Sequence, residues 1–198
     1  MFIQVVQGHT AHAAGLRTRL DDWVEGHSEA AAGWLGTTAG VTASGEFVAV
    51  VRFEDEASAR HNSERAEQGD WWQETERLFD GPVAFHDYAH TDVLLGGGSD
   101  GAGFVQVIQG EYTGDGSPAI SGREAAVISA LRPELIGGTM GWDDGGHFTQ
   151  TVYFTSEEDA RTGEGAMGEN ADAQEMMEAW QTSVTGVRYL DLRDPWLS

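Results

Sequence analysis

The chain has 198 residues, of which 33 are acidic and 11 basic, and its formal net charge at pH 7 is −22. Such an acidic surface repels phosphate backbones and anionic lipids, so neither nucleic acid nor a membrane surface is an expected partner. The chain has no cysteine, which excludes disulfides and thiolate metal sites. It also has no apolar run near the roughly 20 residues that span a bilayer and no apparent signal peptide, so we expect a cytoplasmic protein.

Taken in chain order, the first half predicts a strand, a helix, two strands, a second helix and a last strand. The first helical stretch covers about 11–32, and Asp55 is typical of the N-cap of the second helix. The strands are expected at 2–7, about 35–43, about 46–53 and 83–89. This element order is that of ferredoxin-like folds.

The second half repeats the first. The heptapeptide that begins at Phe2 returns at Phe104 with identity at five of seven positions. The strands of this half are expected at 104–109, about 135–142, about 147–154 and 184–191. Its first helix is expected to begin at Ser117-Pro118, and Ser156 is expected to cap its second helix. We interpret the matches as a tandem duplication.

A glycine-rich linker at 95–102 is expected to separate the first repeat, 1–94, from the second, 103–198. The predicted strand at 46–53 is largely apolar on both faces, which indicates that both faces of the sheet are covered. The predicted fold class is therefore α+β, with two ferredoxin-like β-α-β-β-α-β repeats packed sheet to sheet as an intramolecular α+β barrel, a pseudo-dimer. One chain suffices for a complete barrel, and further oligomerisation stays open.

Four segments resemble the antibiotic-biosynthesis-monooxygenase-like domains of the dimeric α+β barrel superfamily: 2–8, 45–53, 59–65 and 71–86. The resemblance implies that a barrel usually made by two chains is fused into one polypeptide. The superfamily includes cofactor-independent monooxygenases, haem-degrading enzymes, other lyases and isomerases. Its haem-degrading branch uses an Asn on the first strand plus a Trp and a His on the second helix. This sequence departs from that pattern, so haem breakdown is not expected.

One predicted strand face of the first half carries Arg52, His86 and Tyr88, and the equivalent face of the second half carries Tyr153 and Arg188. We expect these side chains in the space between the two sheets, since they share one face of the predicted strands. An Arg or His in such an interior must be paired or must line a wet cavity. Together with aromatic walls they would hold an anionic aromatic or quinone-like ligand. The alternative is that Arg52 pairs with an acid at an exposed edge.

The main asymmetry between the halves is the segment that contains His61, Asn62 and the Trp71-Trp72 pair, which the second copy lacks. Polar and aromatic residues kept in only one copy indicate a single site. Alternatively, the second copy drifted, and Trp71 or Trp72 belongs to the core. His61 or His86 is the candidate general base, and Arg52 the candidate stabiliser of a substrate anion.

The remaining candidates for substrate binding are Asn62, Trp72, Tyr88, Tyr153, Arg188, Gln4 and Gln106. The resemblance implies a cofactor-independent monooxygenase-like enzyme that acts on a small aromatic or quinone-like molecule, whose anion reacts with oxygen. No cofactor is expected. No metal site is expected either, because His9 and His12 have no evident third ligand. The alternatives are a non-catalytic small-ligand-binding protein and a structural or interaction module with a filled barrel.

Overall fold

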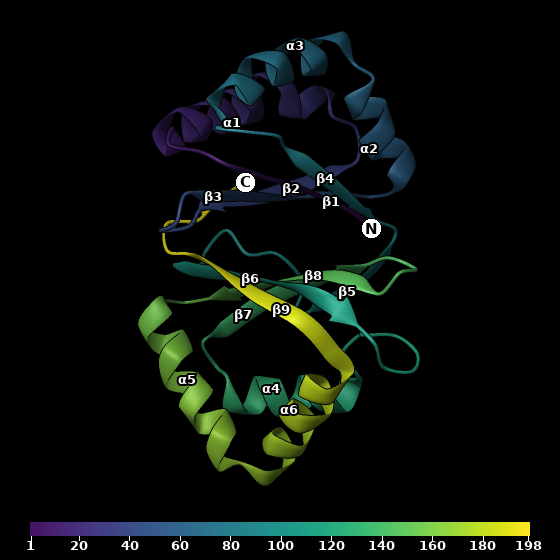
Figure 1. The fold of residues 1–198 in the computed structure, drawn as a ribbon, viewed down its shortest axis with the longest axis vertical. Helices are drawn as coiled ribbons and strands as arrows, with labels where there is room; N and C mark the ends of the chain where they lie inside the picture. Colours follow the sequence, from purple (N-terminus) through teal and green to yellow (C-terminus); the bar gives the residue numbers. More distant parts are fainter. The chain divides into compact units, whose positions relative to one another are not determined.

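The computed structural model describes residues 1–198, which form two compact units. Unit 1 consists of Met1–Ala89 with Asp194–Ser198, and unit 2 consists of His90–Arg193. Each unit contains one five-stranded antiparallel sheet with helices over one of its faces (Figure 1). The predicted α+β class with ferredoxin-like units is confirmed. No helix has the length and apolar content that a bilayer crossing requires.

Unit 1 has the strand order β10-β2-β3-β1-β4. Its strands are β1 (Phe2–His9), β2 (Trp34–Val41), β3 (Glu46–Phe53), β4 (Ala84–Tyr88) and β10 (Trp196–Leu197). Its helices are α1 (Ala13–His27), α2 (Glu56–Ser63) and α3 (Ala66–Thr75), with short 3₁₀ turns η1 (Ser28–Ala30) and η2 (Glu76–Leu78).

Unit 2 has the corresponding strand order β5-β7-β8-β6-β9. Its strands are β5 (His90–Leu94), β6 (Phe104–Tyr112), β7 (Leu135–Trp142), β8 (His147–Phe154) and β9 (Val184–Leu192). Its helices are α4 (Gly122–Leu131), α5 (Glu157–Glu169) and α6 (Ala171–Ser183). Four strands of each sheet therefore follow one order, β2-β3-β1-β4 in unit 1 and β7-β8-β6-β9 in unit 2. The paired strands β2 and β3, and likewise β7 and β8, lie close to the predicted ranges.

Two edge strands were not predicted from the sequence. β5 follows β4 along the chain but pairs with β7 of unit 2, and β10 follows β9 but pairs with β2 of unit 1. The end of the chain is anchored by two backbone hydrogen bonds between Thr37 and Ser198. Each sequence repeat thus supplies a terminal strand to the sheet of the other unit.

The alternation of side chains along β3 assigns the two faces of the unit 1 sheet. Phe47 and Ala49 pack against Leu16 of α1, which places them on the side of the helices. Val48 and Val50 point to the other side and are fully buried. The side chains of β3 are therefore buried on both sides of the strand, in keeping with its apolar character.

The second helix of each repeat is two helices, where a single helix was predicted. Asp55 and Ser156 cap α2 and α5 as expected, accepting hydrogen bonds from the amides of Ser58 and Asp159. Asn170 then ends α5 and caps α6, because its extended backbone interrupts the helix and its side chain accepts from the amide of Ala173. An Asn that satisfies a free amide in this way favours a new helix start over continuation.

The predicted start of the first helix in unit 2 was wrong: α4 begins at Gly122. Ser121 and Glu124 form a capping box, in which Glu124 N donates to Ser121 Oγ and Ser121 N donates to Glu124 Oε2. This pair satisfies two amides reciprocally. Ser117, the predicted cap, accepts a hydrogen bond only from the amide of Ala119, in a local turn.

Ser121→Ala is expected to lower the free energy of unfolding by about 1 kcal/mol, since it removes the cap and leaves an amide of the first turn without a partner. Ser117→Ala is the matched control and is expected to change it by less than about 0.5 kcal/mol. Urea denaturation followed by circular dichroism measures both. Equal effects of the two substitutions would contradict the assigned start of α4.

Candidate functional site

Unit 1 contains a cavity of about 260 Å³ between its sheet and its helices. This volume lies just below the roughly 300–1,000 Å³ range of small-molecule sites. The wall is formed by β1, β2, β3 and β4 on the sheet side and by α1, α2 and α3 with the segment after them. Seven of the lining side chains are aromatic: Trp23, Phe47, Phe53, Trp71, Trp72, Phe79 and Phe85.

Trp72 is the centre of this aromatic wall. Its ring centroid lies 5.1 Å from that of Phe85 in an edge-to-face contact, and 6.2 Å from the centroids of both Phe79 and Trp71. Trp23 of α1 continues the series at 6.4 Å from Trp71. Such contacts hold rings in fixed orientations, so the cavity presents rigid π surfaces to a ligand.

The polar part of the wall consists of uncharged side chains: Gln4, Thr37, Asn62, Ser63, Gln68 and Thr75. None of the lining residues is ionisable. A ligand inside would therefore meet amides and hydroxyls rather than a charge or a general base. This chemistry suits a neutral aromatic molecule better than an anion.

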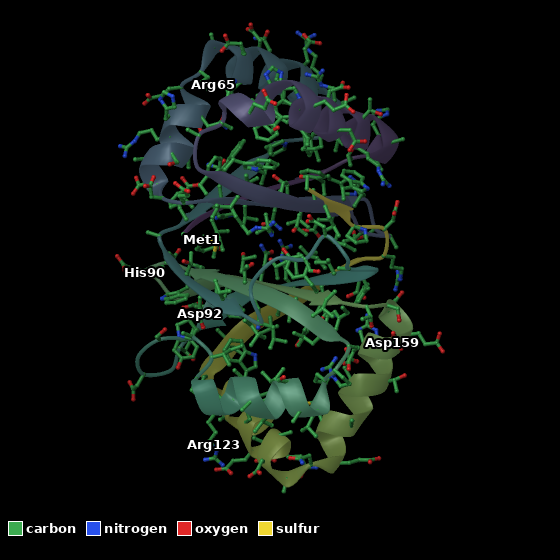
Figure 2. The ribbon with its side chains drawn as sticks, turned by 180° about the vertical axis from the view of Figure 1, so that it is seen from behind. Met1, Arg65, His90, Asp92, Arg123 and Asp159 are labelled. Atoms are coloured by element: carbon green, nitrogen blue, oxygen red, sulfur yellow. The ribbon has the colours of Figure 1, made fainter.

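The amide side chains of the wall are held by neighbours outside it. Gln4 Nε2 on β1 donates to Asp87 Oδ1 on β4 at 2.9 Å, across a directly paired strand position. Asn62 is only 6% exposed, and its Oδ1 accepts from the guanidinium of Arg65 at 3.0 Å. Figure 2 shows Arg65 in the helical layer of unit 1.

Gln68 is held by another residue of the wall, because Trp23 Nε1 donates to its Oε1 at 2.6 Å. The indole of Trp71 donates to the carbonyl of Arg19, and the hydroxyl of Thr75 donates to the carbonyl of Trp71. The helical part of the wall is thus tied together by hydrogen bonds as well as by ring contacts.

The structure brings three predicted substrate-binding residues together at this cavity: Gln4, Asn62 and Trp72. Both Trp71 and Trp72 line it. His61 neighbours Asn62 along α2, but its side chain is exposed and does not belong to the wall.

Arg52, His86 and Tyr88 lie on the other face of the unit 1 sheet. Ile3 pairs with both Arg52 and Tyr88, and Val5 pairs with His86, so the three share the face of Val5. Arg52 is buried and donates to Thr38 Oγ1 at 3.1 Å, so it does not lie at an exposed edge. His86 is exposed and Tyr88 is buried. The roles given to these three residues stay predictions.

In unit 2, Tyr153 and Arg188 occupy the corresponding face of the sheet. Tyr153 is fully buried. Arg188 donates through Nε and Nη2 to Gln109 Oε1, at 3.0 and 2.8 Å, and Gln109 also donates to Thr149. Their proposed contact with a substrate likewise stays a prediction.

Gln106 lines a second cavity, of about 630 Å³, between the helices and the sheet of unit 2. Its wall differs in chemistry from that of unit 1. Four methionines contribute to it, Met140, Met167, Met176 and Met177, together with five charged residues, Glu124, Arg132, Arg161, Glu164 and Asp191. Trp180 and Tyr189 are its aromatic residues.

Ion pairs occupy the charged side of the unit 2 cavity. Arg161 contacts Glu164 at 2.9 Å and Asp191 at 2.6 Å. Partial burial alone would lower the pKa of Arg161, but the hydrogen bond to Glu164 and the charges of Asp191 and Glu157 raise it above its ordinary value. Gln106 Nε2 donates to Asp191 Oδ1 at 2.9 Å, which repeats the Gln4–Asp87 bond of unit 1.

Sequence reasoning missed most of the aromatic and amide wall of the unit 1 cavity. One signal was present: Leu16, Leu20 and Trp23 recur at i, i+4 and i+7, which places them on one face of α1. All three line the cavity. No comparable signal in the local pattern of α3 marks Gln68.

No family model matches the sequence, and no curated protein matches it. In structure, the chain is similar to two proteins named "putative monooxygenase". The one from Fusobacterium nucleatum has a TM-score of 0.70 and 9% identity, over 96% of this chain and 90% of that chain. The one from Lactobacillus acidophilus has a TM-score of 0.67 and 11% identity, over 100% and 99%.

The structure is also similar to that of an anthrone oxidase-like protein. The TM-score is 0.59 and the identity 13%, over 99% of this chain and 93% of that chain. At these identities the likeness establishes the fold, which extends over both units. Fold does not determine chemistry, because function depends on the residues of the site.

Proposed function

We propose that the protein is a monooxygenase-like enzyme that binds a small aromatic molecule in the unit 1 cavity and oxidises it with molecular oxygen without a cofactor. The observation that carries the proposal is the cavity itself, which is walled by seven aromatic side chains and by uncharged polar groups. The names of the three proteins with this fold support an oxidative reaction. An apolar site with a few placed polar groups is typical of small-molecule binding.

The proposed reaction uses no external electron donor, so the substrate itself supplies all the electrons that O₂ accepts. A substrate carbon that carries two hydrogens next to aromatic rings, as in an anthrone, is oxidised to a carbonyl. One oxygen atom of O₂ enters the substrate, and the other leaves as water with the two hydrogens. The substrate loses four electrons and O₂ gains four, so substrate and oxygen alone balance the reaction.

The residues of the cavity would bind and orient the substrate and polarise its oxygen substituents. Aromatic walls around Trp72 would stack on the substrate rings, and the amides of Gln4 and Asn62 would hydrogen-bond to its oxygen substituents. Amide donors aimed at an oxygen stabilise negative charge that develops there. Because no lining group is a base, the substrate has to be acidic enough at carbon to release its proton to solvent. His61 and His86, the bases predicted from the sequence, lie outside this wall.

A second function has an observation in its favour: the wall has no ionisable side chain. A non-catalytic binding protein needs the same aromatic cavity and no base. The two functions differ in turnover, and binding by itself does not separate them.

Oxygen uptake with anthrone as substrate, measured against heat-denatured protein, separates the two. The enzyme is expected to consume one O₂ per anthrone, and with ¹⁸O₂ the quinone product carries one labelled oxygen. A binding protein is expected to show quenching of tryptophan fluorescence by anthrone with oxygen uptake at the rate of the denatured control. That second outcome would overturn the enzymatic proposal.

A further inference from the structure

The amide side chains in the unit 1 cavity have orientations that are chemically forced by their partners. A carboxylate accepts hydrogen bonds and does not donate them. Because Asp87 Oδ1 is the partner of Gln4, the NH₂ group of Gln4 must face Asp87, and the carbonyl Oε1 is the end left for a ligand. The bond therefore settles which end of the amide is which, a choice that atomic positions alone leave ambiguous.

The two amides on the helical side are oriented in the opposite sense. The Arg65 guanidinium only donates, so it must face Asn62 Oδ1, and the NH₂ group of Asn62 is left for a ligand. The Trp23 indole also only donates, so it must face Gln68 Oε1, and the NH₂ group of Gln68 is left. The cavity thus offers a hydrogen-bond acceptor from β1 and donors from α2 and α3.

From this arrangement we propose that the unit 1 cavity selects aromatic molecules that carry both a free hydroxyl and a ketone carbonyl. Gln4 Oε1 accepts from the hydroxyl, and the NH₂ groups of Asn62 and Gln68 donate to the carbonyl. Gln4 is then a specificity-determining residue, and Asp87 is a positioning residue that acts through it. The inference rests on the proposed function for the location of the site, and it names the substrate class of that site.

Four molecules with one bicyclic skeleton test the inference: 6-hydroxy-1-tetralone, 6-methoxy-1-tetralone, 1-tetralone and 5,6,7,8-tetrahydro-2-naphthol. Dissociation constants are measured by tryptophan fluorescence and calorimetry at a pH at which the phenol is neutral. The hydroxyketone is expected to bind about ten-fold more tightly than the methoxyketone, since capping the hydroxyl removes its only donor. Removal of either the hydroxyl or the carbonyl is expected to weaken binding to a similar extent.

Asp87→Asn tests the role of the positioning residue. An Asn at 87 can donate as well as accept, so the amide of Gln4 is free to turn, and the preference for hydroxyl over methoxy is expected to fall to about two-fold. Asp87 is exposed, so the variant retains its packing. The matched control is Asp144→Asn, at an exposed position of unit 2. It removes the same charge and is expected to keep the full ten-fold preference for hydroxyl over methoxy.

Asn62→Asp tests the donor end. The carboxylate still accepts from Arg65, but the NH₂ group of Asn62 is gone, so the contribution of the ligand carbonyl to affinity is expected to fall to the part that Gln68 supplies. Equal affinity of wild type for the hydroxyketone and the methoxyketone would overturn the inference, as would a full preference in the Asp87 variant or no binding of any of the four. If the wild-type protein prefers the hydroxyketone to the methoxyketone but takes up no oxygen with anthrone, the proposed function is wrong and this inference still holds.

Discussion

Replacing Gly163 by alanine is expected to lower the free energy of unfolding by about 2–3 kcal/mol, although alanine is the better helix former. Gly163 is buried in α5 beneath the ion pair of Arg132 and Glu134. A Cβ at this position would overlap Glu134 Oε1 and lie 2.5 Å from Arg132 Nε. Overpacking of this kind typically costs about 1–3 kcal/mol, and disturbing a buried ion pair adds to the cost.

Gly165, two residues further along the same helix, is the matched control. A Cβ there would meet nothing within 4 Å. Gly165→Ala is therefore expected to raise the free energy of unfolding by up to about 1 kcal/mol, the difference in helix propensity alone. Urea denaturation gives both values. A Gly163 variant that gains stability as the Gly165 variant does would show that the ion pair does not pack against α5.

The central elements were predictable because their signals are local. The Asp55 and Ser156 caps act on their own neighbours, and the strand alternation follows from a period of two. The predicted cap of α4 was wrong by four residues, since Ser117-Pro118 satisfies the same rule that Ser121 satisfies better through Glu124. The two edge strands depend on pairing with the distant strands β2 and β7, which no local pattern contains.

The candidate site was predictable only in part, for a physical reason. Gln4, Asn62 and Trp72 were named from the sequence and line the cavity. Asn62 and Trp72 were named because a residue kept in one repeat and lost in the other points to a special role, whereas Gln4 has a counterpart, Gln106, in the second repeat. The strand pattern also separated the two faces of the sheet correctly. Which face borders an open volume depends on how side chains from four strands and three helices fill the space between them. Periodicity does not contain that information.

The two repeats differ at corresponding positions in a way that supports one aromatic site. In the alignment of the repeats, Asn62 of α2 corresponds to Gly163 of α5, and both are buried. In unit 1 the Asn side chain lines the cavity, whereas in unit 2 the Arg132–Glu134 pair packs over the glycine. A side chain at this position is therefore compatible with one unit and incompatible with the other. The polar group of the unit 1 site cannot be restored in unit 2 by one substitution.

Trp72→Ala is expected to weaken binding of 6-hydroxy-1-tetralone by about thirty-fold and to lower oxygen uptake with anthrone to that of denatured protein. Trp72 contacts Phe85, Phe79 and Trp71, so its removal takes away the main ring surface of the wall and loosens its neighbours. A lost aromatic contact with a well-packed ligand corresponds to roughly 2 kcal/mol. The free energy of unfolding is expected to fall as well, by about 2–3 kcal/mol.

Trp180→Ala is the matched control, since stability loss alone does not identify a site. Trp180 lines the unit 2 cavity and makes a similar edge-to-face contact with Phe148, at 5.4 Å between centroids. This variant is expected to lose a similar free energy of unfolding but to keep the affinity for the hydroxyketone within about two-fold, because the ligand occupies the neutral cavity of unit 1. Equilibrium denaturation and fluorescence titration of both variants give the comparison. Loss of binding in the Trp180 variant with full binding in the Trp72 variant would place the ligand in unit 2.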